Sequence, residues 1–466
     1  MEIIVENRIR LKNPPDILKQ LLVEKLRIVN PKYVEAEASG RSLWGIDQFI
    51  TNFIMLTDES MYIPRGLRMW ILNQCAEMDI DFTLHDNRTK FDHRNINSTK
   101  IIYRPYQMPA IIELVSTADE GILVAPAGSG KTVMGLSLIP LLGQPTLWLT
   151  HTGPLATQAR ERAKSFLPNI GKIGLIGKGK WEKGEILTIA MIQTLFKNPE
   201  KLIKMRNDFG LVIQDEGHHV AARTFLEVIC QLNPWFLYGL TATPYRRDKL
   251  EMLMFQTIGM DKTIIPIKEV EKYGGIIVPV VKCKTFRADT VNGNKIQDIL
   301  KNNIVNNTRR NNMIVNDVLD EARSNHFCIV ISDRREHCEM LYKQISKRWK
   351  KTGIATGKYS KKYIKEQVTA FNDGNITVLV ATFALLGEGF DVPFLDRAFI
   401  SMPFRAEAKA EQLVGRIQRA FPGKKDAIVY DYVDVGIGVL ENQFRNNRRD
   451  CRYRVYKRLG IPVEMI

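Results

Sequence analysis

The segment GILVAPAGSGKT, residues 121–132, constrains the fold more than any other stretch of this sequence. An apolar run that suits a strand is followed by a turn of small residues, and then by Lys-Thr at the start of an apolar, helix-forming stretch. This order is typical of a phosphate-binding loop, in which Gly128 and Gly130 let the backbone curl so that its N–H groups point at phosphate oxygens. The alternative is a chance glycine-rich turn, which fits less well because the strand and the helix stand on the correct sides.

The positions of this loop have distinct expected roles. Lys131 is expected to contact the β- and γ-phosphates of ATP, and the hydroxyl of Thr132 is expected to bind Mg²⁺. Ala125 stands where the usual pattern begins with glycine, a replacement that some nucleotide-binding families accept. The main-chain N–H groups expected to face the phosphates are those of Ala127, Gly128, Ser129 and Gly130.

From about residue 101, short apolar runs alternate with stretches of helical periodicity. Such alternation predicts parallel sheets covered by helices on both faces. The rhythm breaks near 260–310 and then resumes, so we expect an α/β protein with parallel-sheet lobes at 98–270 and 271–466, preceded by a small α+β domain at 1–97. The expected strands are GILVAP, TLWLT, ILTIA, GLVIQD, WFLYGLT, FCIVIS, ITVLVAT, RAFISM and DAIVYDYV.

Charge and cysteine usage narrow the class of protein. Lys and Arg number 67 against 51 Asp and Glu, which gives a formal net charge of +16. An excess of this size favours a polyanionic partner, most often nucleic acid, over a basic protein without such a ligand. The six cysteines contain no C-x-x-C pair, so reduced thiols are expected. The sequence shows no apolar run long enough for a membrane span and no signal-peptide layout, which predicts a cytoplasmic protein, or one in the host cytoplasm if it is phage-encoded.

The segment LVIQDEGHH, residues 211–219, ends an apolar run with two acids and two histidines. In a phosphate-loop fold, Asp215 is expected to hold Mg²⁺ and Glu216 to orient and deprotonate the attacking water. Oxygen ligands suit Mg²⁺, whereas zinc would need further His or Cys ligands that the neighbouring sequence lacks. His218 is then expected to form a polar link from the nucleotide to the neighbouring Thr-Ala-Thr segment.

Further motifs follow in a fixed order, and together they resemble those of the superfamily 2 helicases and translocases. They are YRPYQ (103–107), LTHTGPLATQ (149–158), MIQTL (191–195), DEGH (215–218), LTATP (240–244), VLVATFALLGEGFDVP (378–393) and QLVGRIQR (412–419). The resemblance covers roughly residues 101–435 and implies two RecA-like lobes that hydrolyse ATP with Mg²⁺ while holding nucleic acid.

Carried over motif by motif, the resemblance assigns further residues. It implies that Gln107 reads adenine while Arg104 or Tyr103 stacks on the base, and that Asp391 touches the ribose or orients an arginine. The residues implied to bind the nucleic-acid backbone are Thr152, Gln193, Thr194 and Thr382. The residues implied to couple ATP hydrolysis to movement are Thr241, Thr243 and Gln412.

Two arginines complete the expected catalytic set. Negative charge develops on the γ-phosphoryl oxygens during hydrolysis, and arginines from the second lobe can stabilise it when the lobes close. Arg416 and Arg419 are spaced i, i+3 in an expected helix, so we expect both to lie on one face and to reach the nucleotide.

The branch of the superfamily is suggested by finer features. Residues 246–248 read Arg-Arg-Asp where XPB-like helicases carry Arg-Glu-Asp, so the middle acid is missing. A compact domain before two lobes is similar to UvsW-type branch-migration helicases. These resemblances imply an ATP-dependent DNA motor that remodels branched DNA in phage or prokaryotic recombination, repair or replication. An RNA helicase, or the motor subunit of a restriction complex, are the alternatives, and protein partners are not indicated.

The two ends of the chain carry no named motif. Residues 1–97 are expected to bind duplex or branched DNA, with Arg65 and Arg68 as phosphate contacts, or else to be a structural accretion. The tail at 441–460 interleaves basic and aromatic residues, which suits either a nucleic-acid track or a solvated basic helix.

Overall fold

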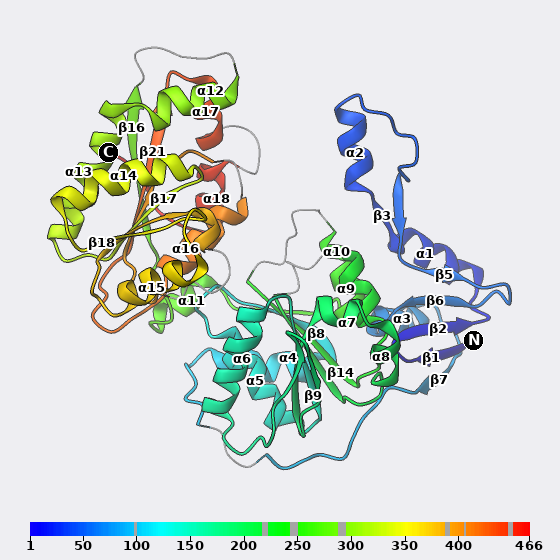
Figure 1. Ribbon diagram of the computed structural model, residues 1–466. Coiled ribbons are helices and arrows are strands. Elements are labelled where there is room, and N and C mark those ends of the chain that lie inside the picture. Colours follow the sequence, from blue (N-terminus) through cyan, green and yellow to red (C-terminus); the bar gives the residue numbers. More distant parts are fainter. Residues whose placement is uncertain are drawn as a thin grey trace. The chain divides into compact units, whose positions relative to one another are not determined.

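The computed structural model describes residues 1–96, 100–216, 222–242, 250–287, 295–386, 392–404, 407–445 and 451–466. The chain divides into two compact units, Met1–Tyr273 and Gly274–Ile466. Each unit contains a parallel sheet with helices on both faces (Figure 1), which confirms the α/β class and the two lobes expected from the alternating sequence. The expected site residues His218, Thr243 and Asp391, and the segment 246–248, lie outside the described residues.

The first unit begins with a small α+β domain. Its sheet has the order β5-β6-β2-β1-β7, and alternate residues of β1 and β2 are buried, as expected for a sheet with one face on a core. The strands are β1 (Glu2–Val5), β2 (Arg8–Lys12), β5 (Ile54–Met55), β6 (Met61–Pro64) and β7 (Thr83–Asp86), and the helices over them are α1 (Asp16–Leu26) and α3 (Arg68–Glu77), preceded by a 3-10 turn at Arg65–Leu67.

An arm is inserted into this domain. It consists of β3 (Arg27–Val29), α2 (Pro31–Ala38) and β4 (Phe49–Thr51), and Figure 1 shows it projecting away from the five-stranded sheet. β3 and β4 pair antiparallel, with Val29 opposite Phe49. Trp44 in the connecting loop is 93% exposed, so the arm presents an aromatic side chain to solvent.

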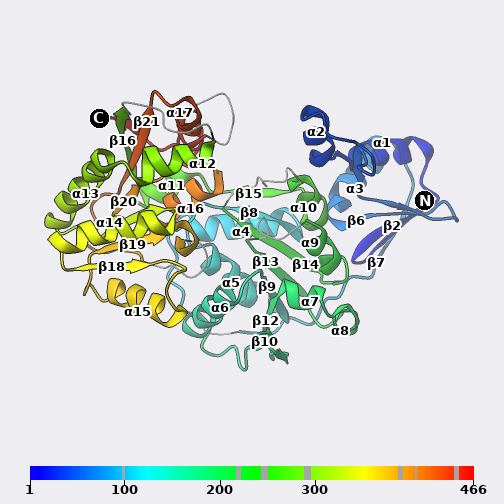
Figure 2. The ribbon, with the colours of Figure 1, turned by 45° about the horizontal axis from the view of Figure 1, so that its top comes forward.

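The sheet of lobe 1 has the order β11-β10-β12-β9-β13-β14-β8-β15, and every pair except β10–β11 is parallel. Helices α4, α5 and α6 cover one face and α7, α9 and α10 the other (Figure 2). The strands are β8 (Glu120–Val124), β9 (Thr146–Thr150), β10 (Gly174–Gly177), β11 (Lys180–Glu182), β12 (Leu187–Met191), β13 (Leu211–Asp215), β14 (Phe236–Thr241) and β15 (Lys262–Ile264). The helices are α4 (Gln107–Thr117), α5 (Lys131–Leu142), α6 (Gly153–Phe166), α7 (Ile192–Phe196), α8 (Pro199–Lys204), α9 (Ala222–Ile229), α10 (Glu251–Ile258) and α11 (Ile267–Lys272).

The second unit is built around a seven-stranded parallel sheet with the order β18-β19-β17-β20-β21-β16-β22. Its strands are β16 (Val280–Arg287), β17 (Cys328–Ser332), β18 (Thr352–Ala355), β19 (Val378–Thr382), β20 (Arg397–Ile400), β21 (Ile428–Val435) and β22 (Val463–Met465). Its helices are α12 (Ile296–Ile299), α13 (Thr308–Arg323), α14 (Arg335–Arg348), α15 (Lys361–Asn372), α16 (Glu407–Ile417), α17 (Gly438–Phe444) and α18 (Arg452–Arg458), with a π-helical turn at Leu300–Val305 and a 3-10 turn at Phe383–Leu386.

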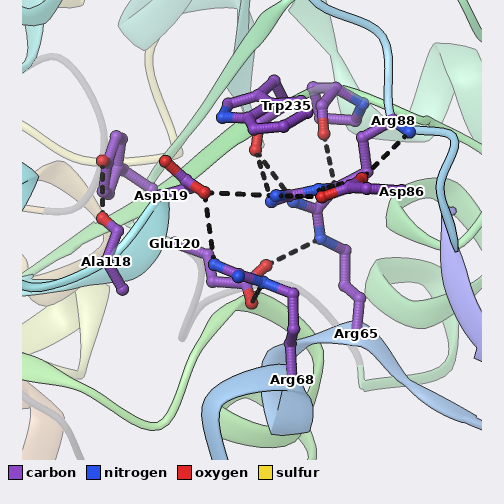
Figure 3. A network of polar contacts seen from close by, with 10 residues as sticks. Arg65, Arg68, Asp86, Arg88, Ala118, Asp119, Glu120 and Trp235 are labelled. Atoms are coloured by element: carbon purple, nitrogen blue, oxygen red, sulfur yellow. Dashed lines mark hydrogen bonds and ion pairs between the residues drawn. The ribbon is translucent and has the colours of Figure 1, made fainter. Parts of the chain in front are cut away.

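The small α+β domain is fastened to lobe 1 by a buried charge network (Figure 3). Arg65 donates to Glu120 at 2.9 Å and to the carbonyl oxygens of Pro234 and Trp235. Arg68 pairs with both Asp119 and Glu120. Arg65 is only 1% exposed. The expectation that Arg65 and Arg68 contact DNA phosphates is therefore wrong, because both guanidinium groups are committed to carboxylates of lobe 1.

The basic tail is also partly a core element. Arg452 donates to Asp431 at 2.8 and 3.0 Å, and the hydroxyl of Tyr456 donates to the same carboxylate at 3.0 Å. Arg452, Tyr456 and Phe444 are all buried. Because these three residues are buried, they form neither a nucleic-acid track nor a solvated helix. The sequence could not indicate that Asp431 would lie against Arg452 and Tyr456.

All six cysteines are buried free thiols, as their spacing predicted. Among the helices that the structure describes, we find none long and apolar enough to cross a membrane.

Candidate active site

The phosphate-binding loop leads from the end of β8 to the start of α5. Gly128 and Gly130 have φ angles of +90° and +88°, a left-handed region that favours glycine. A Cβ added at Gly130 would also collide with the side-chain amide of Gln107. The backbone of this loop thus requires glycine at both positions, as the sequence pattern predicted.

Lys131, the first residue of α5, points back into the loop. Its Nζ donates to the carbonyl oxygen of Ala125 at 3.1 Å and lies 3.3 Å from Oε1 of Glu216. Glu216 has a φ of +50°, which is unusual for a residue with a side chain, and its N–H donates to the carbonyl oxygen of Leu240 at 2.9 Å. Lys131 and Glu216 are far apart in the sequence, but the fold brings them together, as expected for two residues predicted to act in the same reaction.

Asp215 is the last residue of β13 and is 6% exposed. The pKa of this carboxyl is raised to about 7, first by burial and then by the neighbouring Glu216, while Lys131 and Arg162 act in the opposite direction. A bound divalent cation would stabilise the ionised carboxylate and so offset the free-energy cost of burying its charge. Asp215 at the end of β13 and Thr132, the second residue of α5, offer oxygen atoms of the kind that a hard cation prefers.

The loop also carries a polar group suited to a phosphate ligand. The hydroxyl of Ser129 is buried and has no hydrogen-bond partner among the described residues. A buried hydroxyl without a hydrogen-bond partner lowers the stability of the fold, unless a bound ligand supplies that partner. Together with the glycine-shaped backbone, this group fits a nucleotide phosphate, and binding of Mg²⁺-ATP by residues 127–132 and Asp215 stays a prediction.

Side chains of the segment YRPYQ donate hydrogen bonds to carbonyl oxygens of the phosphate-binding loop. Gln107 is 3% exposed; its Oε1 accepts from the N–H of Arg104 at 2.9 Å and its Nε2 donates to the carbonyl oxygen of Ser129 at 2.8 Å. Tyr106 also donates to Ser129, and Arg104 donates to the carbonyl oxygen of Gly128 at 3.1 Å. Gln107 is thus engaged by the loop itself, and adenine recognition by Gln107 and Arg104 stays a prediction. The contribution of Tyr106 was not foreseen, although its place one residue before Gln107 was a signal.

Thr241 connects a second strand to the same loop. It ends β14 opposite Val124 of β8, and its carbonyl oxygen accepts from the N–H of Ala125 at 3.0 Å. A displacement at the end of β14 would therefore reach the phosphate-binding loop through this hydrogen bond. The coupling role of Thr241 stays a prediction, as does that of Gln412, which lies on α16 in the second unit.

The expected nucleic-acid contacts of lobe 1 share one edge of its sheet. Thr152 is the N-cap residue of α6, just beyond the end of β9, and Gln193 and Thr194 lie on α7, just beyond the end of the neighbouring β12. Oγ1 of Thr152 and Oε1 of Gln193 are shielded and have no hydrogen-bond partner among the described residues. In the second unit, Thr382 ends β19 beside Ser332 of β17.

The arginines of the last motif do not share a helix. Arg416 lies in the final turn of α16, which ends at Ile417, whereas Arg419 forms an isolated bridge with Ile276. The partly buried ammonium of Lys424 donates to the carbonyl oxygens of Ile417 and Arg419. The expectation that both arginines occupy one helical face is wrong, because these contacts end the helix before Arg419. Their reach toward the nucleotide stays a prediction.

One cluster of metal-type ligands is instead an ion-pair network. His326, Asp396 and Asp426 have ligand atoms within 4.8 Å of one another. The guanidinium of Arg397, 3% exposed, lies among them: it donates to Asp426 at 2.7 Å and approaches Nε2 of His326 at 2.9 Å. Because a cationic side chain already fills this position, the cluster is a structural network and not a metal centre.

Comparison with protein families adds independent information. A family model described as the res subunit of type III restriction enzymes matches residues 100–246. A second, described as the helicase conserved C-terminal domain, matches residues 310–421. These ranges contain the motifs of lobe 1 and of the second unit, respectively.

Three relatives, from two viruses and one archaeon, illustrate the similarity. Probable helicase D10 of Escherichia phage T5 is 28% identical over 68% of this chain and 68% of its own length. Putative ATP-dependent RNA helicase L396 of Acanthamoeba polyphaga mimivirus is 25% identical over 96% of this chain and 83% of its own length. DNA 3'-5' translocase XPB2 of Sulfurisphaera tokodaii is 26% identical over 72% of this chain and 82% of its own length.

Among solved structures, a fragment of a putative HsdR subunit of a type I restriction enzyme from Vibrio vulnificus has a TM-score of 0.56. It is 16% identical, over 98% of this chain and 84% of the fragment. At this identity the likeness concerns the fold, and it agrees with the α/β lobes described above.

Proposed function

The chain belongs to the superfamily 2 helicases and translocases, and on that premise we propose that it is an ATP-driven DNA motor that remodels branched DNA, as in fork regression and branch migration. Hydrolysis of ATP is the activity of this family.

One observation carries the chemistry: Nζ of Lys131 lies 3.3 Å from Glu216, at the mouth of the glycine loop and beside the buried Asp215. Thr132 and Asp215 would hold Mg²⁺, which neutralises charge on the phosphate oxygens when bound. Lys131 would exchange its partner Glu216 for a phosphate and leave that carboxylate to accept a proton from water. Arg416 and Arg419 would stabilise the charge that develops on the γ-phosphoryl group.

The grip on nucleic acid is proposed to run along the sheet edges marked by Thr152, Gln193 and Thr194 in lobe 1 and by Thr382 in the second unit. Hydroxyl and amide groups at such positions bind the sugar–phosphate backbone and carry little sequence information. Repeated changes of grip during ATP turnover would then move the chain along a strand. The archaeal relative named as a DNA translocase supports DNA as the track. The mimivirus relative, named as a putative RNA helicase, supports RNA as the alternative.

Recognition of a branch is proposed for the small domain at 1–97, and more narrowly for its arm. Arg65 and Arg68 are unavailable, but the arm presents Trp44, which is 93% exposed. An exposed indole offers a stacking surface to unpaired bases, which occur at a branch point. Residues 30–48 of the arm take part in none of the hydrogen bonds described between this domain and lobe 1, so their removal should leave that contact closed.

The test is ATPase rate and strand displacement over a panel of forks, four-way junctions, blunt duplexes, single-stranded DNA and single-stranded RNA, at matched salt. We expect the strongest stimulation by branched DNA. Stimulation by RNA alone would support the RNA helicase, and activity that requires co-purified nuclease or methyltransferase chains would support a restriction motor.

A second arm of this test uses an excision variant. Because Val29 lies opposite Phe49, residues 30–48 can be replaced by a two-residue Asn-Gly turn that joins the strands. This variant should keep DNA-stimulated ATPase and lose the preference for branched over linear DNA. An unchanged preference in the folded variant would remove the arm from the proposal.

A further inference from the structure

A tight hairpin flanks the nucleic-acid edge of lobe 1. β10 and β11 pair antiparallel with Gly177 opposite Lys180, so that Lys178 and Gly179 form the turn. Their φ angles are +52° and +80°, both in the left-handed region. A lysine in this region is uncommon, because Asn and Gly occupy such turns more readily. The turn therefore keeps a side chain at a position where glycine would be easier.

The side chain of Lys178 folds back onto the start of α6. Its Nζ donates to the hydroxyl of Thr157 at 3.0 Å. Its Cε lies so close to Gly153 that a Cβ there would come within 2.6 Å of it. The absence of a side chain at Gly153 thus makes room for the lysine beside the first turn of α6.

The ammonium group lies beside the first turn of α6, whose N-cap residue is the expected backbone-binding Thr152. Thr152, with its shielded and unpaired hydroxyl, immediately precedes Gly153. On the other side, Gly177 packs against Met191, whose sulfur would be 2.7 Å from a Cβ at that glycine, and Met191 leads directly into α7 with Gln193. β9, β12 and β10 are parallel neighbours, so their carboxyl ends place these groups along one edge.

The charge of Lys178 has no carboxylate partner among the described residues. Lys180, two positions further along the same hairpin, is paired with Glu182 at 3.8 Å. The two lysines are both exposed, yet only the first is held by a hydrogen bond against α6. An exposed lysine that is oriented by a hydroxyl and lies near the unpaired hydroxyl of Thr152, which can donate, is suited to an anionic ligand.

We propose that Lys178 binds a backbone phosphate of the nucleic acid, in the same row as Thr152 and Gln193. This inference rests on the proposed function, since it adds a residue to the same track. A phosphodiester oxygen would accept from the ammonium group, while Thr157 fixes its position. The contact reads charge and not sequence, and it is common to DNA and RNA.

The test compares Lys178→Gln with Lys180→Gln, which removes an equal charge from the same hairpin. Binding of a single-stranded DNA oligonucleotide, its RNA counterpart and a duplex would be followed by fluorescence anisotropy over a salt series. Lys178→Gln is expected to weaken binding about fivefold, the effect of one exposed charge contact. The slope of log K against log salt should fall by roughly 0.7–0.9, because one fewer counterion is released. Lys180→Gln should keep the wild-type slope, and Lys178→Arg should restore most of the loss.

A second variant addresses position at constant charge. Gly153→Ala would push the lysine away from α6, so a folded Gly153→Ala protein is expected to bind more weakly while it keeps all of its lysines. Equal slopes for wild type, Lys178→Gln and Lys180→Gln would overturn this inference alone. A wild-type protein that binds neither DNA nor RNA would overturn the proposed function together with it.

Discussion

The guanidinium of Arg65 donates to the carboxylate of Glu120 at 2.9 Å, and the two side chains are only 1% and 3% exposed. Glu120 is the first residue of β8, and the other end of this five-residue strand leads into the phosphate loop. The small N-terminal domain is therefore attached to the strand that carries the catalytic loop. Gly66, next to Arg65, approaches the backbone of Gln256 and Gly259 so closely that a Cβ would not fit, which makes this attachment tight.

Arg65→Gln should lower the free energy of unfolding of the first unit by roughly 3–5 kcal/mol, because the substitution leaves Glu120 buried with a weakened partner network. Chemical denaturation would measure this change. Arg41→Gln is the matched control, since Arg41 pairs with Glu35 where both side chains are exposed, and it should cost less than about 1 kcal/mol. Equal losses would contradict the structural role of the buried pair. For the same reason, deleting residues 1–97 is expected to destabilise lobe 1, so the arm excision is the sharper test of branch recognition.

Lys131→Ala should abolish ATP turnover, because it removes the ammonium group that lies between Ala125 and Glu216 in the phosphate-binding loop. Nucleic-acid binding should persist, since its expected groups lie at other strand ends. Phosphate release and anisotropy on the same preparation would check both. Turnover like that of the wild type would refute the assignment of the phosphate loop.

Glu216→Gln should separate ATP binding from hydrolysis. Asp215 and Lys131 remain to hold the metal and the phosphates, whereas an amide cannot accept a proton from the attacking water, so hydrolysis should fall by orders of magnitude. Titration with a fluorescent ATP analogue and a phosphate-release assay would measure the two effects. Activity that follows added zinc, or a zinc-selective chelator, would contradict the Mg²⁺ site.

Arg416→Ala and Arg419→Ala should each lower kcat by roughly 10³ or more, with a smaller effect on ATP affinity, if they stabilise the transition state. Arg458→Ala removes a positive charge from a surface pair with Glu411 on the neighbouring α16 and should leave kcat close to that of the wild type. Steady-state kinetics with separately measured ATP affinity would distinguish the cases. A variant that loses only affinity would indicate ground-state binding.

His337 predicts a pH dependence of stability in the second unit. Burial, with a further contribution from the charge of Arg310, lowers the pKa of this imidazole to about 3. Ser332 and Asn311 hydrogen-bond its two nitrogens. The unfolded state takes up a proton near pH 6.5 and the folded state does not, so stability is present above that pH and is lost as pH falls toward 3. The loss should be about 2 kcal/mol by pH 5. Denaturation of wild type and His337→Gln at pH 7 and pH 5 would show it, since the variant should lose less. Parallel losses would contradict the assignment.

The sequence alone determined the elements whose signals are local. A fully apolar run followed by Ala-Gly-Ser-Gly-Lys-Thr specifies a strand, a left-handed turn and a helix, and the structure has β8, Gly128, Gly130 and α5 in those places. The buried strands from TLWLT to DAIVYDYV were found for the same reason, since both faces of a parallel sheet are covered and its strands are largely apolar.

Only the tertiary structure decided which polar side chain meets which. The sequence predicted a surface phosphate contact for Arg65, but in the fold this arginine pairs with Glu120. It predicted a helical position for Arg419, but α16 ends before this residue, which contacts Ile276 and Lys424 instead. Lys178 gains its significance from Thr157 and Gly153, which belong to a different element. Periodicity reports the local conformation and the face that is buried, but a charged or polar group is paired by residues far away in sequence. The sequence therefore specified the lobes and the phosphate loop, and the long-range packing specified the partners that surround them.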